Sequence, residues 1–356
     1  MNILEQIYEI NFEKINFLER KHSLKNENTI IIGPPKCGKS YLIYDFLSKF
    51  DSSKYIYIDF DDYRNIQIDI IKNLEEFISL HSIEILVLEN FKFDFDLPKV
   101  TTTIITSKID KDFEEFHKIY LNGLDFEEFI LFDNKHQNTI NSFNSFLKFG
   151  NLPEIIEFSE IKKSKRNNEI CKLYCENSTQ LDILYLLIKS AGENKSIFQL
   201  YNQLKKTTKI SKDKFYEICE KFDYNNVVYF CEKYNQPKAA KKIFVFDHSM
   251  IDFISYNKNF TNLFKNMLYL ELLSKNHKVY YLDNIDFFLP LEKIIILAIP
   301  FYNDMILDNI TKKLIPIIDK YDINEISIIT VSGEKVLYID EIEVQIMQFP
   351  SWALTL

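Results

Sequence analysis

The stretch Gly33-Pro34-Pro35-Lys36-Cys37-Gly38-Lys39-Ser40 decides how the N-terminal part of this chain folds. It fits the phosphate-binding pattern G-x-x-x-x-G-K-S/T. The β-branched run Thr29–Ile32 before it predicts a buried parallel strand, and Tyr41–Leu47 after it predicts a helix. The glycines let the backbone curl with its N–H groups inward, and the helix start adds free N–H groups and a positive dipole end. The stretch therefore predicts a site for the phosphates of a nucleotide.

Two residues of this loop carry most of the expected chemistry. Lys39 is placed to reach the β- and γ-phosphates, and Ser40 is placed to put its hydroxyl on a Mg²⁺ ion. We therefore expect Lys39 in the catalytic set and Ser40 as a metal ligand. The expected nucleotide-binding residues are Gly33, Pro34, Pro35, Lys36, Cys37, Gly38, Lys39, Ser40 and Tyr41.

Length and composition limit which classes of protein this chain can belong to. The 356 residues are enough for two or three domains, and 46% hydrophobic residues supply material for their cores. The net charge of −9 weighs against a chain coated with nucleic acid. The five scattered cysteines indicate free thiols rather than a disulfide framework, and no apolar run of about 18 residues or leader segment is visible. We expect a cytoplasmic protein without a membrane partner.

A second strand is predicted at Tyr55–Phe60, and three carboxylates crowd its end: Asp59, Asp61 and Asp62. In a parallel sheet, side chains at the carboxyl ends of strands lie near the ligand crevice. These aspartates either contact Mg²⁺ through water or cap the loop, and the sequence leaves both alternatives open. The charged segment 1–28 before the first strand is predicted to be helical.

The third predicted strand, Ile83–Asn90, ends in the pair Glu89-Asn90. Nucleotide hydrolases of this build usually end this strand in Asp-Glu, where the Asp lies near Mg²⁺ and the Glu polarises the attacking water. Glu89 can still accept a metal-bound water, so we expect it in the metal site and the catalytic set. Asn90 stands at the position of the base but cannot take a proton, and losing a general base costs about 10²–10⁴-fold in rate. We expect slow or absent hydrolysis.

A fourth strand at Val100–Lys108 ends in Thr106, Ser107 and Lys108. A polar residue at this strand end contacts the γ-phosphate or the water in such enzymes, and we place Ser107 in the catalytic set. The alternation of strands and helices predicts an α/β fold with a doubly wound parallel sheet.

Three stretches resemble one family. The loop is similar to its G-P-R-x-x-G-K-S/T, with Pro35 where the Arg stands; Ile119–Phe129 is similar to its L-x-P-L-S-F-x-E-F, and Phe149–Glu154 to its G-G-F-P-E turn. The family is a prokaryotic group of AAA-like ATP-binding proteins. The resemblance implies ATP as the nucleotide and three domains: a P-loop ATP-binding domain (1–165), a winged helix (166–255) and a small restriction-endonuclease-like α/β domain (256–356). It also implies kinship with ATPases that act as nucleotide-gated switches.

The middle of the chain has the elements of a winged helix. The basic stretch Ile161–Arg166 suggests a joint before it, and three predicted helices and two predicted strands follow: 181–190, 196–204, a helix from 210, 227–230 and 242–247. Lysines within Lys205–Lys214 are compatible with DNA phosphates. The third helix also carries acids, and no arginine is available to read guanine. DNA binding therefore stays an alternative to a packing module that relays the nucleotide state.

The C-terminal part follows the order of a nuclease-like fold, one helix, three strands, a helix and a strand. Asp286 stands at the position of the metal-binding Asp, but Lys265 replaces the helix Glu, and Ala298 and Pro300 replace the Glu-x-Lys pair. One carboxylate does not hold a catalytic Mg²⁺, so we expect a scaffold without nuclease activity. The segment from Ile342 to Leu354 is expected to close this domain as a strand and a helix.

The sequence is consistent with three functions. The first is a regulatory protein that binds ATP and Mg²⁺ and hydrolyses ATP slowly or not at all. The second is a competent ATPase that uses Glu89 with another carboxylate, Asp59 or Asp61. The third is a winged-helix DNA-binding protein. A protein partner is possible, the oligomeric state is open, and the three arginines Arg20, Arg64 and Arg166 do not identify an arginine finger.

Overall fold

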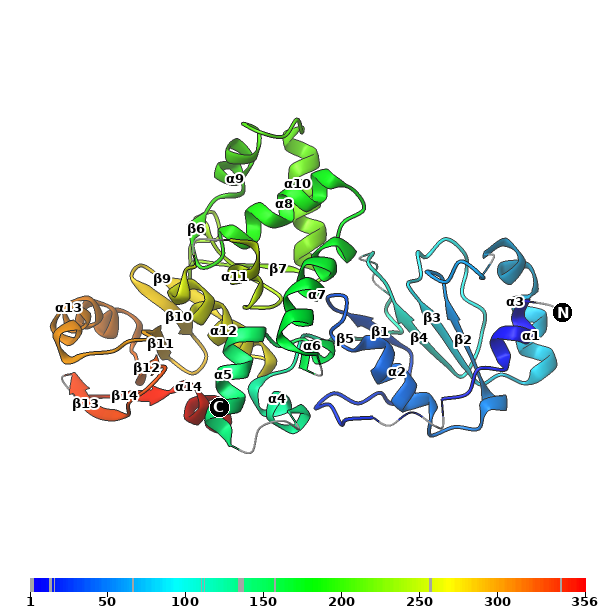
Figure 1. The fold of residues 1–356 in the computed structure, drawn as a ribbon, viewed down its shortest axis with the longest axis horizontal. Helices are drawn as coiled ribbons and strands as arrows, with labels where there is room; N and C mark the ends of the chain where they lie inside the picture. Colours follow the sequence, from blue (N-terminus) through cyan, green and yellow to red (C-terminus); the bar gives the residue numbers. More distant parts are fainter. Residues whose placement is uncertain are drawn as a thin grey trace. The chain divides into compact units, whose positions relative to one another are not determined.

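The computed structural model describes residues 3–12, 15, 17–65, 67–109, 111, 113–133, 138–156, 158–255, 258–339 and 341–356. The chain forms two compact units, each treated by itself below. Unit 1 holds Met1–Asn122 with Tyr224–Asn226, and unit 2 holds Gly123–Asp223 with Val227–Leu356. Figure 1 shows their helices and strands coloured along the sequence.

Unit 1 is built on a parallel sheet, as the sequence predicts, and this sheet has five strands. Its strands are β1 (Thr29–Ile32), β2 (Tyr55–Asp59), β3 (Ile85–Glu89), β4 (Thr102–Thr106) and β5 (His117–Tyr120). They lie in the order β2-β3-β4-β1-β5, and each neighbouring pair is parallel. The phosphate-loop stretch thus leaves the sheet from an interior strand, with β4 and β5 on either side.

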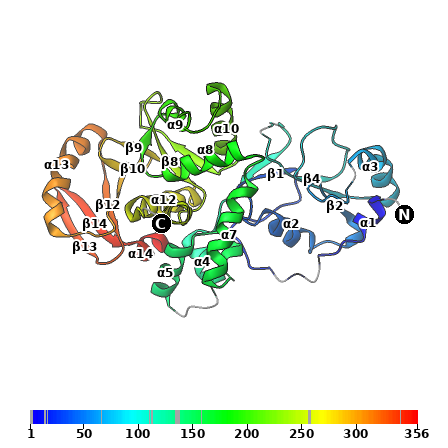
Figure 2. The ribbon, with the colours of Figure 1, turned by 45° about the horizontal axis from the view of Figure 1, so that its top comes forward.

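Helices cover both faces of this sheet because its strands are apolar on both sides. Ile30 and Ile32 belong to one core with side chains of α1 (Ile3–Tyr8) and α3 (Gln67–His81). Ile31 points the other way and joins the core formed with α2 (Lys39–Leu47). Side chains that alternate along the strand in this way need a helix layer on each face, and Figures 1 and 2 show α1, α2 and α3 beside the sheet. A short 3₁₀ turn, η1 (Ser52–Lys54), leads into β2.

The prediction that residues 1–28 are helical is wrong beyond α1. Between Glu9 and Asn28 the described residues form no helix. Phe12 and Leu24 are instead buried in the core beside α2. Their burial along an irregular path outweighs the weak helical pattern of this charged segment.

The first four predicted strands are confirmed to within three residues at each end, but the sequence did not predict β5. Its side chains are polar or half exposed, so it lacks the apolar run that marked the others. Parallel pairing with the buried strand β1 holds it in the sheet.

Unit 2 contains a helical part built around a small antiparallel sheet. Its helices are α7 (Glu160–Leu173), α8 (Ser178–Lys189), α9 (Ile197–Leu204), α10 (Lys212–Tyr224) and α11 (Met250–Ile254). The sheet has the order β6-β8-β7, from β6 (Asn194–Lys195), β7 (Val228–Cys231) and β8 (Lys241–Val245). The three predicted helices and two predicted strands are therefore present. The stretch Ile161–Arg166 is not an irregular joint, since it lies inside α7.

A mixed six-stranded sheet forms the C-terminal part of unit 2. Its order is β13-β14-β12-β11-β10-β9, from β9 (Tyr280–Leu282), β10 (Ile285–Leu289), β11 (Ile294–Ala298), β12 (Glu325–Thr330), β13 (Lys335–Ile339) and β14 (Ile342–Gln348). Helix α13 (Asp304–Tyr321) packs on one face and continues through Pro316, while α12 (Phe260–Ser274) and α14 (Phe349–Thr355) pack on the other. The predicted helix–strand order and the closing strand and helix are confirmed, and β13 was not predicted.

Three further helices belong to unit 2: α4 (Phe126–Phe132), α5 (Thr139–Phe149) and α6 (Pro153–Ile156). Asp125 starts α4 through a capping box with Glu128. Phenylalanines of α4 and α5 pack against Phe349 of α14. All five cysteines of the chain are free thiols, as the sequence predicts.

Asp247 and His248 are fully buried beside the C-terminal end of α5. Asp247 accepts hydrogen bonds from the N–H and the hydroxyl of Ser249, both at 2.8 Å. Gly150, at φ 88°, approaches so closely that a Cβ there would lie 2.1 Å from the Asp247 carboxylate. Burial raises the pKa of Asp247 to about 6 and lowers the pKa of His248 to about 4.

We expect Asp247→Asn to change how the free energy of unfolding depends on pH. A carboxyl group whose pKa is raised in the folded state favours folding below its unfolded pKa, near 3.8, and loses that contribution as pH rises through about 6. The variant should therefore gain up to ~3 kcal/mol relative to the parent between pH 4 and pH 7. Urea unfolding of both proteins across this range measures the gain, and a pH-independent difference would contradict it.

Candidate functional site

The phosphate-loop stretch forms a tight turn at the carboxyl end of β1. Gly38 caps α2 in the left-handed region at φ 103°, and Lys36 is also left-handed at φ 69°. A Cβ at Gly33 would lie 2.0 Å from the carbonyl oxygen of Leu121, so only glycine fits there. The two glycines of the pattern are thus required for different reasons. Gly33 is required by the close approach of another backbone segment, and Gly38 by its left-handed backbone conformation.

Lys39 curls back over its own loop. Its ammonium group donates to the carbonyl oxygens of Gly33 at 2.8 Å and Pro34 at 2.9 Å. The charge is therefore held at the loop where the pattern expects phosphate oxygens. A bound anion would compete with these two neutral acceptors for the ammonium protons.

The Glu89 carboxylate contacts the first turn of α2 through Ser40. It is 6% exposed, and its two oxygens have different partners: Oε1 accepts from the Ser40 hydroxyl and Oε2 from the Tyr57 hydroxyl. The Tyr57 hydroxyl also lies 3.2 Å from that of Tyr44. Burial raises the pKa of Glu89 despite these bonds, and burial with the nearby Glu89 charge raises the pKa of Tyr57.

Asn90 turns away from Glu89 into a left-handed conformation at φ 58°. Its side-chain amide donates to Asp59 at 2.9 Å, and its backbone N–H donates to the Thr106 hydroxyl at 2.9 Å. Asp59 faces Glu89 in the register of β2 and β3 and also accepts from the N–H of Asp61. The ends of three strands therefore meet at this edge of the sheet, as the sequence predicts.

Ser107 has local partners. Its hydroxyl donates to the carbonyl of Phe91 at 2.7 Å and accepts from the N–H of Ile109 at 3.0 Å. None of the described hydrogen bonds joins Ser107 to the phosphate loop. Lys108 lies 3.8 Å from Asp61 in an exposed ion pair. The catalytic role expected of Ser107 stays a prediction.

The residues present fit a magnesium ion bound together with a nucleotide. Ser40 and Glu89 bring a hydroxyl and a carboxylate oxygen into direct contact beside the loop, and oxygen ligands are those that Mg²⁺ prefers. In the described part of the chain, no group of three or more His, Cys, Asp or Glu residues is suited to hold a metal by itself. Mg²⁺ is commonly held by one or two protein ligands, while phosphates and water complete its shell.

Sequence reasoning missed two residues of this site. Arg20 donates to the carbonyl of Cys37 at 2.8 Å and to that of Asn122 at 3.2 Å, so it braces the phosphate loop from the N-terminal segment. Tyr57 lies within the strand predicted at Tyr55–Phe60, where the sequence assigns its hydroxyl no role. Their chemistry was visible in the sequence, but no short motif signals a partner that is 17 or 32 residues away.

The single acid expected at a nuclease-like centre in unit 2 is neutralised by lysines. Asp286 Oδ1 lies 2.7 Å from Lys265 Nζ and 3.4 Å from Lys242 Nζ, and Oδ2 accepts from the N–H of Ala298. Burial lowers the pKa of Lys242, and the Asp286 charge opposes this shift.

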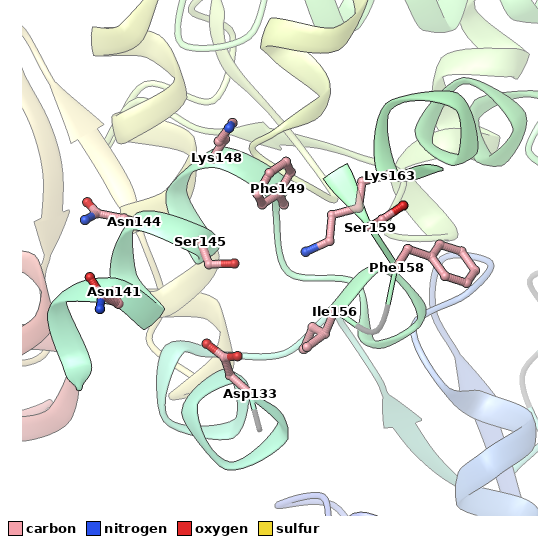
Figure 3. Close-up of a pocket in the computed structure, with 10 residues that line it drawn as sticks. All are labelled: Asp133, Asn141, Asn144, Ser145, Lys148, Phe149, Ile156, Phe158, Ser159 and Lys163. Carbon is pink, nitrogen blue, oxygen red and sulfur yellow. The ribbon is translucent and has the colours of Figure 1, made fainter. Parts of the chain in front are cut away.

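A cavity of about 660 Å³ lies elsewhere in unit 2, among α5, the segment after α6 and α7 (Figure 3). Asn141, Ser145 and Lys148 line it from one face of α5. Lys163 is buried on its other side, with its ammonium 4.2 Å from the centre of the Phe149 ring. The lining combines apolar surface with polar side chains and carries both signs of charge.

Comparisons with known proteins agree with the geometry of unit 1. Residues 25–92 match the family model described as an AAA domain. The chain is also similar to an uncharacterized protein of Methanocaldococcus jannaschii, with 25% identity over 300 residues that cover 70% of this chain and 67% of the relative. A solved Walker-type ATPase of Pyrococcus abyssi matches at a TM-score of 0.42 and 14% identity, over 71% of this chain and 93% of that one; no conclusion rests on this likeness.

Unit 1 therefore contains a P-loop AAA-type domain, the class of domain that binds ATP. The match spans the phosphate loop, β2 and β3, which together carry Lys39, Ser40 and Glu89. No helix in the described residues is long and apolar enough to cross a membrane.

We expect Arg20→Ala to weaken ATP binding because the loop loses the group that braces the Cys37 carbonyl. One hydrogen bond to a charged group contributes about 1.5–3 kcal/mol. If part of this free energy holds the loop in its binding conformation, its loss should raise the ATP dissociation constant roughly 3- to 30-fold. A fluorescent ATP analogue in a titration measures the change. Arg64→Ala is the matched control, since Arg64 is exposed and pairs with Asp62; equal affinities of both variants would contradict a bracing role.

Proposed function

We propose that this chain is a nucleotide-gated regulatory protein that binds ATP with Mg²⁺ and hydrolyses it slowly or not at all. The loop Gly33–Ser40 and Tyr41 bind the nucleotide, and Lys39 holds its β- and γ-phosphates. Ser40 and Glu89 provide the protein's ligands to Mg²⁺. The presence or absence of the triphosphate then selects the arrangement of the domains.

The observation that carries the slow hydrolysis is the state of the pair Glu89-Asn90. The Glu89 carboxylate accepts hydrogen bonds from Ser40 and Tyr57, and in this proposal it serves Mg²⁺ as a ligand and does not serve a water as a base. Asn90 stands where a base is needed, and its amide N–H₂ is turned to Asp59. An amide oxygen can orient a water but cannot take its proton.

Mg²⁺, when bound, supplies neutralisation of phosphate charge and orientation of the triphosphate. The chain's own residues then bind the triphosphate and do not take part in a proton transfer. Lys39 exchanges the carbonyls of Gly33 and Pro34 for phosphate oxygens, and the N–H groups at the start of α2 face the same anion. These contacts stabilise a bound triphosphate without requiring a proton transfer.

We expect the unaltered protein to bind ATP and release little phosphate, and Lys39→Ala to abolish detectable binding. Asn90→Glu should raise single-turnover phosphate release about 10²-fold or more, because it restores a carboxylate at the position of the base. ATP titration and phosphate release on the same purified samples measure both effects. Asn90→Gln is the matched control, since it lengthens the side chain without adding a base.

Brisk multiple turnover by the unaltered protein would contradict this function and favour the second candidate, a competent ATPase. One observation supports that candidate: Asp59 lies 2.9 Å from the Asn90 amide and beside Glu89 in the sheet register, so it could serve as the missing base. In that case Asp59→Asn should abolish phosphate release while ATP binding persists. Unchanged ATP affinity in Lys39→Ala would contradict both candidates.

For unit 2 we propose a winged helix followed by a nuclease-like scaffold that does not cleave DNA. The three helices α8, α9 and α10 with the antiparallel sheet β6-β8-β7 support the first part. The pairing of Asp286 with Lys265 and Lys242 supports the second, because a carboxylate neutralised by two ammonium groups is a poor ligand for a divalent cation.

The turn between α9 and α10 carries the lysines that a DNA backbone would contact. Lys205, Lys206 and Lys209 are exposed around a hollow of about 340 Å³. We expect fluorescent duplex DNA with Mg²⁺ to show neither a specific, salt-dependent shift nor cleavage. A shift weakened by Lys206→Ala with Lys209→Ala would restore the DNA-binding alternative, and cleavage lost in Asp286→Ala would overturn the inactive scaffold.

A further inference from the structure

We propose that Tyr57 is a positioning residue for the magnesium ligand Glu89. Its hydroxyl holds one carboxylate oxygen so that the other is presented to Ser40 and to the Mg²⁺ position. This inference rests on the proposed ATP·Mg²⁺ site, and it assigns a role to a residue outside the phosphate loop and the acidic strand end.

The first support is the division of the carboxylate between two hydroxyl donors. The Ser40 hydroxyl is bonded to Oε1 and the Tyr57 hydroxyl to Oε2. Tyr57 and Glu89 are 8% and 6% exposed, so water does not readily replace the tyrosine. Because each oxygen is held by its own donor, the carboxylate plane has one favoured orientation.

The second support is that Tyr57 itself is held firmly. The Tyr44 hydroxyl lies 3.2 Å from the Tyr57 hydroxyl, and the two rings belong to one aromatic cluster. Phe12 stacks on Tyr44 with ring centres 4.5 Å apart and meets Tyr57 edge-on at 5.4 Å. A donor on a packed ring in a strand keeps its position better than one on a loop.

The hydroxyl of Tyr57 is separable from the rest of its side chain. Tyr57→Phe keeps the ring and its packing but leaves Oε2 of Glu89 buried without this donor. The carboxylate then gains freedom to rotate, and Oε1 is no longer fixed on Ser40. Removing a residue that orients a metal ligand typically costs 10- to 100-fold in metal affinity.

The test is the Mg²⁺ dependence of ATP binding. We expect Tyr57→Phe to need about 10-fold more Mg²⁺ for half-maximal tightening of ATP, while ATP affinity in EDTA stays at the parental value. Tyr44→Phe is the matched control: it removes a hydroxyl from the same cluster but not a partner of Glu89, and its Mg²⁺ requirement should change much less. Thermal melting without nucleotide shows whether each variant is folded.

A double-mutant cycle makes the test specific to Glu89. In a Glu89→Gln background, adding Tyr57→Phe should leave the Mg²⁺ requirement unchanged, because the carboxylate that Tyr57 orients is already gone. An unshifted Mg²⁺ requirement in Tyr57→Phe overturns the inference. So does a shift that persists in the Glu89→Gln background, or an equal loss of affinity with and without Mg²⁺, since both indicate a structural role.

The outcomes separate this inference from the proposed function. If the unaltered protein binds no ATP, or binds it equally well after Lys39→Ala, the proposed site itself fails and the role of Tyr57 falls with it. If ATP binding depends on Lys39 but not on Mg²⁺, the nucleotide site stands, while the magnesium site at Ser40 and Glu89 and the positioning role of Tyr57 are both overturned. If Mg²⁺ tightens ATP binding equally in the parent and in Tyr57→Phe, only the positioning role is overturned.

Discussion

The hydrogen bond between the Ser40 hydroxyl and the buried Glu89 carboxylate ties the helix after the phosphate loop to the third strand of the sheet. Burying a carboxylate is costly unless its oxygens are bonded, so this contact constrains everything around it. It requires a second donor, which Tyr57 provides. The loop must also end where Ser40 can reach β3. Two glycines make this possible: Gly33 lies close against the backbone of Leu121, and Gly38 adopts the left-handed conformation that begins α2.

Unit 2 meets the same constraint differently. Asp286 is paired with two lysines, and Asp247 is bonded to Ser249 within a fully buried corner. Asp286 joins segments that are distant in the sequence through Lys242 and Lys265. Asp247 lies tightly against the backbone at Gly150. A buried ionic group of this kind stabilises little compared with an apolar core, but removing one partner leaves an uncompensated charge.

What the sequence could predict follows from how local each cause is. The loop Gly33–Ser40 and the strands β1 to β4 are encoded by short runs, and the structure contains them where the pattern predicts. Strand β5 has no apolar run and exists because β1 offers it a free edge. The segment after α1 carries a helical pattern but is held in the core through Phe12 and Leu24. Arg20 and Tyr57 act through partners that only the tertiary fold brings near, so no local pattern could reveal them.

Two carboxylates, Glu89 and Asp59, lie at the edge of the sheet where a hydrolase usually carries one Asp-Glu pair. Glu89 is buried and accepts hydrogen bonds from Ser40 and Tyr57. This arrangement suits a metal ligand better than a general base. Asp59 is half exposed and accepts from Asn90 Nδ2, which leaves the amide oxygen of Asn90 as the group available to a water. That oxygen can accept a hydrogen bond without removing a proton. A water could thus be oriented near the phosphates and remain unreactive, so the triphosphate state would persist long enough to act as a signal.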